Sequence, residues 1–317
     1  MNIPDVQVPL PAMTEEDIKS ITFGCLHDID IIAASFIRSK EHVLEIRKLL
    51  QEKGKPDICL ISKIENIQGV ENFDAILEVS DGIMVARGDL GVEMPLEEVP
   101  CLQKTMIRKC YLQGKTVITA TQMLESMIKN PRPTRAEVSD VANAIYDSTS
   151  AVMLSGETAV GLYPIETVRV MRRIILEAET HFPYKTFLDQ MGKREGIDIS
   201  SSVALAAVKT AYNSNAKAIF AFTNSGFSAR NASQFRPQMP IFALASLPKV
   251  YHQLAISWGV VPLDPYSASN IQEGFAYVKK CVLKDEKLQK GDLVVMTAGE
   301  PFGMKGTTNM MIVECIS

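Results

Sequence analysis

The sequence predicts an α/β fold made of two domains, and two observations carry this prediction. From Leu10 to about Phe182, short apolar runs alternate with helix-like stretches, a pattern typical of parallel strands joined by crossover helices. A polar stretch over residues 185–198 then separates this part from a second series of apolar runs and helical segments. We therefore expect domains at residues 1–184 and 199–317, joined by a linker at residues 185–198.

The first domain is expected to hold parallel strands that are covered on both faces. Each apolar run is nearly continuous in Val, Ile, Leu, Met and Ala, as such strands should be. The runs cover residues 29–36, 58–64, 82–86, 116–120 and 151–154. Between them, the pattern Thr-Arg-Ala-Glu from Thr134 to Glu137 is that of a capping box and predicts the start of a helix. Pro164 suits the first position of the next helix, which should end near Pro183.

The second domain is expected to be a smaller α/β unit. Its apolar runs cover residues 218–223, 240–245, 259–263, 293–297 and 310–315. Helical stretches such as residues 202–212 and 271–283 lie between these runs.

Composition excludes several classes of protein. The chain has 317 residues, 46% hydrophobic content and a formal net charge of −4. Acidic and basic residues are mixed along it, so no electrostatic field favours binding to nucleic acid or to an anionic membrane. No apolar run approaches the roughly 18 residues of a membrane span, and the first residues do not resemble a signal peptide. We therefore expect a cytoplasmic protein. The six cysteines and four histidines are scattered, which favours reduced thiols and no zinc.

An unusual pair of charges stands at the end of the run at residues 58–64. Lys63 and Glu65 are two positions apart on a strand, so their side chains project from the same face. Opposite charges in an apolar strand are costly unless they are used. A buried ion pair is the alternative, but such pairs often contribute little net stability. We therefore favour a functional role for both residues.

The segment from Met84 to Gly91 is an apolar strand followed by a glycine-flanked turn that holds Asp89. The glycines allow backbone N–H groups to approach a ligand closely, and a helix that begins just after the turn would favour an anion there. Glu65 and Asp89, at the ends of neighbouring strands, would together offer two carboxylate oxygens to magnesium. Taken alone, the Arg-Gly-Asp pattern also occurs in ordinary turns.

Thr121 follows the next run, where a strand passes into a predicted helix. A threonine at this place may serve only as a helix cap. However, polar groups at the carboxyl ends of successive strands are typical of β/α barrel enzymes. The order of Lys63, Asp89 and Thr121 along the chain therefore favours an active site.

Four segments together resemble motifs of the pyruvate kinase family, in that family's order and with its approximate spacing. They cover residues 61–70, 84–91, 119–127 and 155–159, and the resemblance extends over essentially the whole chain. It implies a TIM (β/α)8 barrel, followed by a C-terminal α/β domain. It also implies phosphoryl transfer from phosphoenolpyruvate to ADP in glycolysis, which gives pyruvate and ATP and depends on Mg2+ (or Mn2+) and K+.

The resemblance assigns roles to the residues named above. Lys63 would stabilise the phosphoryl group in flight, and Glu65 and Asp89 would hold the magnesium ion. The backbone at Gly88 and Asp89 would bind the carboxylate of phosphoenolpyruvate. Thr121 would contact the substrate near the face where enolpyruvate is protonated. These roles suit the chemistry, because phosphoryl transfer requires mainly positioning and charge neutralisation.

In the second domain, one loop resembles the family's loop for the phosphate of a sugar-phosphate activator. It contains Thr223, Asn224, Ser225, Gly226 and Ser228. Hydroxyl and backbone N–H groups after a strand suit a phosphate, although an ordinary solvated turn is the alternative. Residues 303–309 would close over the same ligand or form a simple connection. The resemblance also implies a homotetramer, with contacts built by apolar residues around Met127 and Ile128 together with the second domain.

The expected barrel is partial. A closed barrel needs all eight strands, and about five are expected here. The family's first three strands, and with them the K+ ligands, have no counterpart in this sequence. Two alternatives to an active kinase follow. One is an inactive fragment whose C-terminal domain binds a phosphorylated effector. The other is a magnesium-dependent lyase or aldolase of pyruvate-like substrates, which would ignore ADP.

Overall fold

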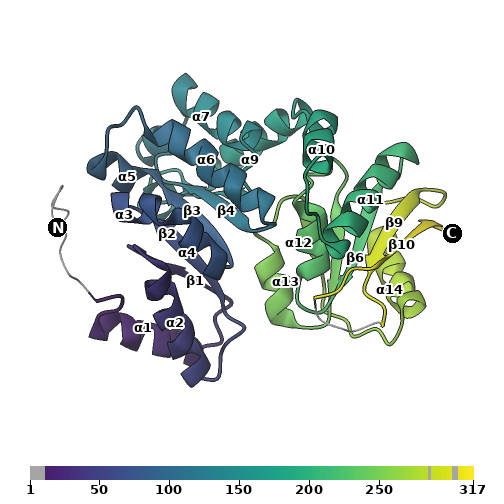
Figure 1. Cartoon of the computed structure of the whole chain (residues 1–317). Helices are drawn as coiled ribbons and strands as arrows, with labels where there is room; N and C mark the ends of the chain where they lie inside the picture. Colours follow the sequence, from purple (N-terminus) through teal and green to yellow (C-terminus); the bar gives the residue numbers. More distant parts are fainter. Residues whose placement is uncertain (1–10, 285–286, 302–305) are drawn as a thin grey trace. The chain divides into compact units, whose positions relative to one another are not determined.

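The computed structural model describes residues 11–284, 287–301 and 306–317. The chain divides into two compact units, which span Met1–Phe182 and Pro183–Ser317 (Figure 1). Each unit is built around its own five-stranded sheet. None of the helices in the described ranges is long and apolar enough to cross a membrane.

The sheet of the first unit is entirely parallel, and its strands follow one another in chain order. The strands are β1 (Ile31–Ala34), β2 (Cys59–Ile64), β3 (Gly82–Ala86), β4 (Thr116–Ala120) and β5 (Ala151–Val152). They confirm the prediction of five parallel strands joined by crossover helices. Because all five strands run the same way, their carboxyl ends lie along one edge of the sheet.

Helices occupy the connections between these strands. They are α1 (Glu15–Leu26), α2 (Lys40–Glu52), α3 (Ile67–Glu71), α4 (Phe73–Val79), α5 (Arg87–Glu93), α6 (Val99–Leu112), the 3-10 helix η1 (Glu125–Ile128), α7 (Arg135–Tyr146), α8 (Gly156–Ala159) and α9 (Pro164–Thr180). The capping box predicted at the start of α7 is present, since the side chains of Thr134 and Glu137 each accept the other's backbone N–H. Pro164 is the first residue of α9, as predicted.

The strands of this sheet are apolar because helices cover them. All five residues of β3 are buried, and the core cluster between the sheet and its helices includes Ile64, Leu77, Val85 and Ile107, each fully buried. A second cluster packs the segment that follows β4 against α7 and α9, and from that segment it includes Met123, Leu124 and Met127. This packing fixes the carboxyl ends of β2, β3 and β4.

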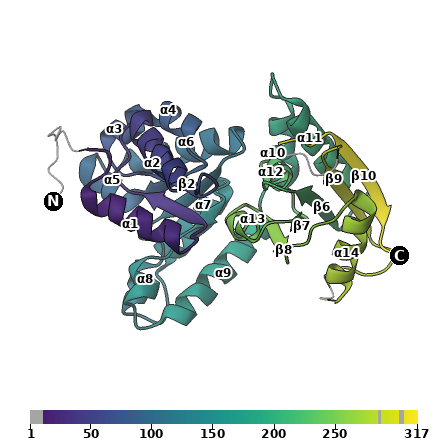
Figure 2. The ribbon, with the colours of Figure 1, turned by 90° about the horizontal axis from the view of Figure 1, so that it is seen from below.

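The sheet of the second unit has the strand order β10-β9-β6-β7-β8. Its strands are β6 (Ala218–Thr223), β7 (Ile241–Ala245), β8 (Val260–Leu263), β9 (Leu293–Ala298) and β10 (Met310–Cys315). All neighbours are parallel except β10, which is antiparallel to β9. The helices are α10 (Tyr184–Gly192), α11 (Ile199–Asn213), α12 (Phe227–Ser233), α13 (Pro248–Leu254) and α14 (Ile271–Lys284). Figure 2 shows α11 and α14 on opposite sides of this sheet.

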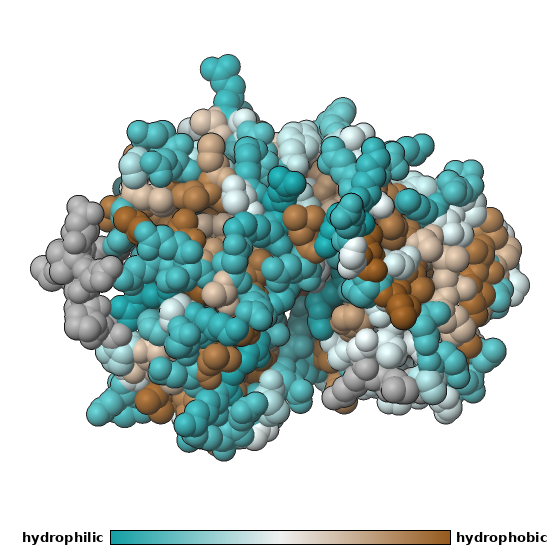
Figure 3. Space-filling view, in the orientation of Figure 1, coloured by the Kyte–Doolittle hydropathy of each residue, from teal (hydrophilic) through white to brown (hydrophobic). Residues whose placement is uncertain are grey.

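The segment at residues 185–198 is not the simple linker that the sequence suggested. Most of it belongs to α10, in which Phe187, Leu188 and Met191 are buried. These side chains recur at helical spacing. Their pattern is short and is interrupted by charged residues, which is why composition favoured an irregular connection. The surface seen in Figure 3 is mostly hydrophilic, with scattered apolar patches on both units.

Candidate active site

The residues predicted to carry chemistry in the first unit lie at the carboxyl ends of three adjacent strands. Lys63 is the next-to-last residue of β2, and Glu65 follows that strand directly. Gly88 and Asp89 follow β3, and Thr121 follows β4. Because β2 pairs with β3 and β3 with β4 in parallel, all three ends lie along the same edge of the sheet.

Lys63 and Glu65 form an ion pair. The Lys63 ammonium lies 2.6 Å from the Glu65 carboxylate, and the two side chains are 23% and 2% exposed. The loop after β1 supports the pair, because Lys63 Nζ donates to Ser35 Oγ at 2.9 Å and the Phe36 N–H donates to Glu65 Oε2 at 2.5 Å. The shared face predicted for these residues is therefore present. A buried ion pair was the alternative to a functional role, and that ion pair is present too. A catalytic role for Lys63 therefore stays a prediction.

Gly88 and Asp89 lie in the first turn of α5, which begins at Arg87 immediately after β3. The sequence suggested a turn with a helix after it, whereas the helix starts before the two glycines. Asp89 is half-buried, and its negative charge is favoured at the amino end of a helix. Among residues of the described ranges, no hydrogen bond or ion pair engages its carboxylate.

Thr121 adopts a backbone conformation that is rare for a β-branched residue. Its φ is +69°, in the left-handed region, which typically costs about 1–3 kcal/mol. Its hydroxyl accepts the Gly88 N–H at 2.8 Å and donates to the Ala120 carbonyl at 2.6 Å. Thr121 does not cap the helix that follows it, since the N-cap residue of η1 is Leu124, but its hydroxyl accepts an N–H of the first turn of α5, so a substrate contact at Thr121 stays a prediction. The hydroxyl connects the ends of β3 and β4.

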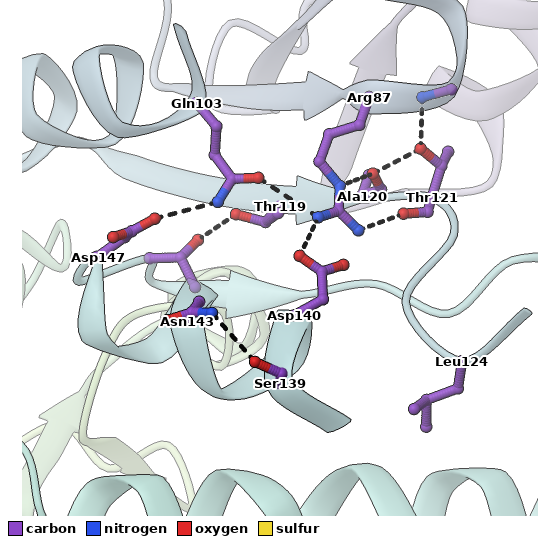
Figure 4. Close-up of polar contacts among 12 residues, drawn as sticks. Arg87, Gln103, Thr119, Ala120, Thr121, Leu124, Ser139, Asp140, Asn143 and Asp147 are labelled. Atoms are coloured by element: carbon purple, nitrogen blue, oxygen red, sulfur yellow. Dashed lines mark hydrogen bonds and ion pairs between the residues drawn. The ribbon is translucent and has the colours of Figure 1, made fainter. Parts of the chain in front are cut away.

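Arg87 holds the turn at Thr121 in place, a contact that the sequence analysis missed (Figure 4). Its guanidinium donates to the Thr121 carbonyl at 2.6 Å and to the Ala120 carbonyl at 3.3 Å. It also pairs with Asp140 of α7 at 2.7 Å. These partners are 33 or more residues away along the chain, so no local pattern indicates them.

Glu157 is the second residue whose part in the site was missed. It is fully buried in α8, and its carboxylate accepts the N–H groups of Leu124 at 3.1 Å and Ser155 at 2.7 Å. The resemblance at residues 155–159 contained this residue without a role for it. Its contacts tie α8 to the loop that follows β4, the loop that begins with Thr121.

The side chains of Glu65 and Asp89 suit a hard cation in their chemistry. Magnesium usually takes one or two carboxylates and completes its coordination with water and substrate oxygens. Glu65 lies beside Lys63, which neutralises its charge in the absence of metal. If Glu65 held a cation, its carboxylate would be shared between that ion and the Lys63 ammonium.

The loop predicted to bind an effector phosphate in the second unit is only partly accessible. Ser228 is 3% exposed, and its hydroxyl is hydrogen-bonded to Thr308 at 2.7 Å. Thr223 is also buried, whereas Asn224 and Ser225 are half-buried. Ser228 therefore has a structural role in the loop, because its hydroxyl is hydrogen-bonded to Thr308 of a neighbouring segment. Of the segment at residues 303–309, residues 303–305 lie outside the described ranges.

Arg230, which the sequence analysis did not single out, folds back over this effector loop. Its guanidinium donates to the Ser225 carbonyl at 2.7 Å. Gly226 has a φ of +81°, and a Cβ there would lie 2.4 Å from Arg230 Nη1. Glycine thus permits both the backbone conformation and the approach of the arginine.

The contacts expected around Met127 for assembly need a correction. Met127 is fully buried in the core of the first unit, so it is not available to another chain. The exposed apolar side chains nearby belong to α9 and to the connection between α8 and α9. They are Val160, Leu162, Ile165 and Val168, which are 77%, 71%, 66% and 52% exposed.

Comparison with known proteins agrees with this arrangement. A family model described as "Pyruvate kinase, barrel domain" matches residues 1–168, and one described as "Pyruvate kinase, alpha/beta domain" matches residues 201–314. A pyruvate kinase of Clostridium acetobutylicum is 49% identical over 316 residues, which cover 100% of this chain and 67% of the relative. A pyruvate kinase of Sporosarcina psychrophila is 48% identical over 316 residues, 100% of this chain and 54% of the relative.

A third relative, the pyruvate kinase of Staphylococcus saprophyticus, is 49% identical over 311 residues, 98% of this chain and 53% of the relative. The chain thus spans about half to two thirds of the length of these relatives. The matches cover both compact units at an identity far above the level at which families become uncertain. The chain belongs to the pyruvate kinase family.

Proposed function

We propose that this chain carries out phosphoryl transfer from phosphoenolpyruvate to ADP, which gives ATP and pyruvate. The observation that carries the proposal is the placement of Lys63, Asp89 and Thr121 at the carboxyl ends of three adjacent parallel strands. Family membership supports the same reaction, its place in glycolysis and its cytoplasmic location. It also makes the lyase or aldolase alternative the less favoured one.

Lys63 supplies the positive charge in this proposal. Its ammonium lies at the strand edge, is partly exposed and is held by Glu65 and Ser35. Phosphoryl transfer gains most from charge that is already in place where the phosphoryl oxygens will lie. An ammonium held in place by Glu65 and Ser35 meets that need.

Glu65 and Asp89 are the residues that would hold magnesium, or manganese in its place. When bound, the ion would neutralise phosphoryl oxygens and orient the substrate. The half-buried Asp89 carboxylate has no hydrogen-bond or ion-pair partner among the described residues, so its oxygens are available to a metal ion. Potassium dependence is proposed only because the chain belongs to this family. No residue of this chain is assigned to that ion.

Gly88, Asp89 and Thr121 would bind the organic part of the substrate. Backbone N–H groups in the first turn of α5 suit the carboxylate of phosphoenolpyruvate. The Gly88 N–H is satisfied by Thr121 Oγ1 in this structure, so a bound carboxylate would share it or take it over. The Thr121 hydroxyl would then be released to face the substrate carbon that receives a proton.

The proposal is tested by pyruvate formation from phosphoenolpyruvate and ADP, with magnesium and potassium present. We expect turnover by the unaltered chain and its loss in Lys63→Ala. Lys109→Ala is the matched control, because Lys109 forms an exposed ion pair with Asp74 away from the strand ends. If the folded chain and both variants are inactive, the alternative of a catalytically inactive fragment gains support instead.

A second proposed function is the binding of a phosphorylated effector in the second unit. Arg230 supports it, because this cation lies against the loop that contains Asn224, Ser225 and Gly226. A sugar bisphosphate titrated into the chain should bind more weakly to Arg230→Gln than to the unaltered protein. Equal binding to both would remove this candidate, whatever the activity of the first unit.

We also propose that copies of this chain associate, with the family's tetramer as the expected assembly. The exposed apolar residues Val160, Leu162, Ile165 and Val168 support a contact surface at α8 and α9, which pack side by side (Figure 2). Soluble proteins seldom leave such a cluster in water without a partner. A second copy is the occupant that family membership favours.

A further inference from the structure

Arg87 connects three elements of the first unit around the turn at Thr121. Its side chain is only 11% exposed. The guanidinium donates to the carbonyls of Ala120 and Thr121, which belong to the peptide groups immediately before and after the left-handed residue (Figure 4). A left-handed β-branched residue persists only where its surroundings fix it. The guanidinium provides two of these constraints.

The guanidinium is itself anchored by the helices behind the strand ends. Asp140 of α7 pairs with it at 2.7 Å, and the Gln103 carbonyl oxygen of α6 accepts from it at 3.4 Å. Gln103 is 6% exposed and is held in turn by Asp147, to which it donates at 3.2 Å. A planar arginine with donors in a fixed fork can serve all these acceptors at once, whereas a lysine offers one point charge.

We propose that Arg87 is a positioning residue for the reaction. It fixes the turn at Thr121, and through that turn it holds the Thr121 hydroxyl beside the Gly88 N–H, the place from which the proposed function has the hydroxyl face the substrate. This inference rests on the proposed function, because Thr121 and Gly88 are substrate contacts only within it. The residue acts through Thr121, and it does not need to touch the substrate.

Hydrogen exchange tests whether Arg87 fixes the turn at Thr121, and it does not require the chain to be active. In Arg87→Lys, the Gly88 amide and the segment at residues 119–124 should exchange about tenfold faster or more, as expected for the loss of a hydrogen bond to a charged group. Protection in α6, α7 and α9 should stay within about twofold. Arg169→Lys is the matched control, since Arg169 forms an exposed ion pair with Glu166. Unchanged protection at Gly88, or equal loss throughout the first unit, would overturn the inference.

A double-mutant cycle tests the link to the reaction. Arg87→Lys should lower kcat by about tenfold with little change in KM, because the group it displaces, the Thr121 hydroxyl, serves the protonation step in the proposed function. Combined with Thr121→Val, it should lower kcat no further, since two residues that act through one hydroxyl are not additive. Additive losses would contradict the inference. Asp140→Asn, which removes the anchor and leaves Arg87 in place, should show a smaller loss with the same non-additivity.

The two proposals fail in different ways. If the unaltered chain shows no turnover, the proposed function fails, and hydrogen exchange still decides whether Arg87 fixes the turn. If turnover is present and Arg87→Lys behaves like Arg169→Lys in both measurements, only the role of Arg87 fails.

Discussion

The backbone N–H of Gly88 donates a hydrogen bond to the hydroxyl of Thr121 at 2.8 Å, and this contact joins the ends of β3 and β4. It brings together two groups that the sequence placed 33 residues apart. The contact also explains why a glycine follows Arg87. A Cβ at Gly88 would lie 3.3 Å from Thr121 Oγ1, tighter than most side chains accept.

Gly88→Ala should weaken phosphoenolpyruvate binding without a matching loss of stability. The added methyl would press on the Thr121 hydroxyl and weaken phosphoenolpyruvate binding, by about tenfold if one hydrogen bond to the carboxylate is lost. Stability should change little, because the preference of a helix for alanine over glycine, about 0.5–1 kcal/mol, offsets the cost of that contact. Thermal unfolding and substrate titration on the same sample measure both. Unchanged binding would show that the Gly88 N–H is not a substrate contact.

Glu157→Gln should destabilise the first unit. The buried carboxylate accepts two backbone N–H groups, from Leu124 and Ser155. An amide offers one oxygen to them and turns its NH2 group against the other N–H, which should cost about 1–3 kcal/mol. Denaturant unfolding gives the value, with Glu166→Gln in an exposed ion pair as the control. A loss as small as that of the control would mean that the carboxylate does not hold the loop.

The dependence of stability on pH should include a contribution from the Glu137 carboxyl group. Partial burial acts to raise the pKa of its carboxyl, but hydrogen bonds from Ser126 and Thr134 outweigh this and hold the pKa below the ordinary value of 4.5. The folded pKa therefore lies below the unfolded one, so the contribution is complete above about pH 4.5 and is lost as the pH falls through the folded pKa.

Unfolding measured from neutral to acidic pH checks this prediction. Glu137→Gln should be less stable at neutral pH, and its stability should fall less steeply on acidification than that of the unaltered chain. Parallel curves for the two proteins would contradict the assignment.

Charge at the α8–α9 surface should disrupt assembly. Leu162→Asp and Ile165→Asp each replace an exposed apolar side chain, so the isolated fold should tolerate them. If copies of this chain meet there, light scattering should show a smaller species for both variants. Leu96→Asp is the control, since Leu96 is an exposed apolar residue of the same unit that lies between α5 and α6. An unchanged mass for the α8–α9 variants would place the contact elsewhere.

Much of the fold could be predicted because burial leaves a plain pattern in the sequence. Strands such as β3, with every residue buried, read as continuous apolar runs. The capping box at Thr134 marks α7 from four residues alone. By contrast, α10 was expected as a linker, since its buried Phe187, Leu188 and Met191 stand among charged residues.

The site could be predicted only where the residue types are themselves unusual. Lys63 and Glu65 stand out because charge is costly in an apolar strand. The left-handed backbone of Thr121 is invisible in the sequence, because a β-branched residue argues against it. The contacts of Arg87 come from residues 16 to 53 positions away, a range over which no periodicity operates.

The most direct test of the central claim is transfer of labelled phosphate from phosphoenolpyruvate to ADP by the purified full chain. We predict that label appears in ATP, that this requires magnesium, and that it falls to background in Lys63→Ala while Lys109→Ala transfers normally. Absence of label in ATP from folded chain at enzyme concentrations near those of substrate would contradict the claim. Transfer that persists without Lys63 would contradict the role given to that residue.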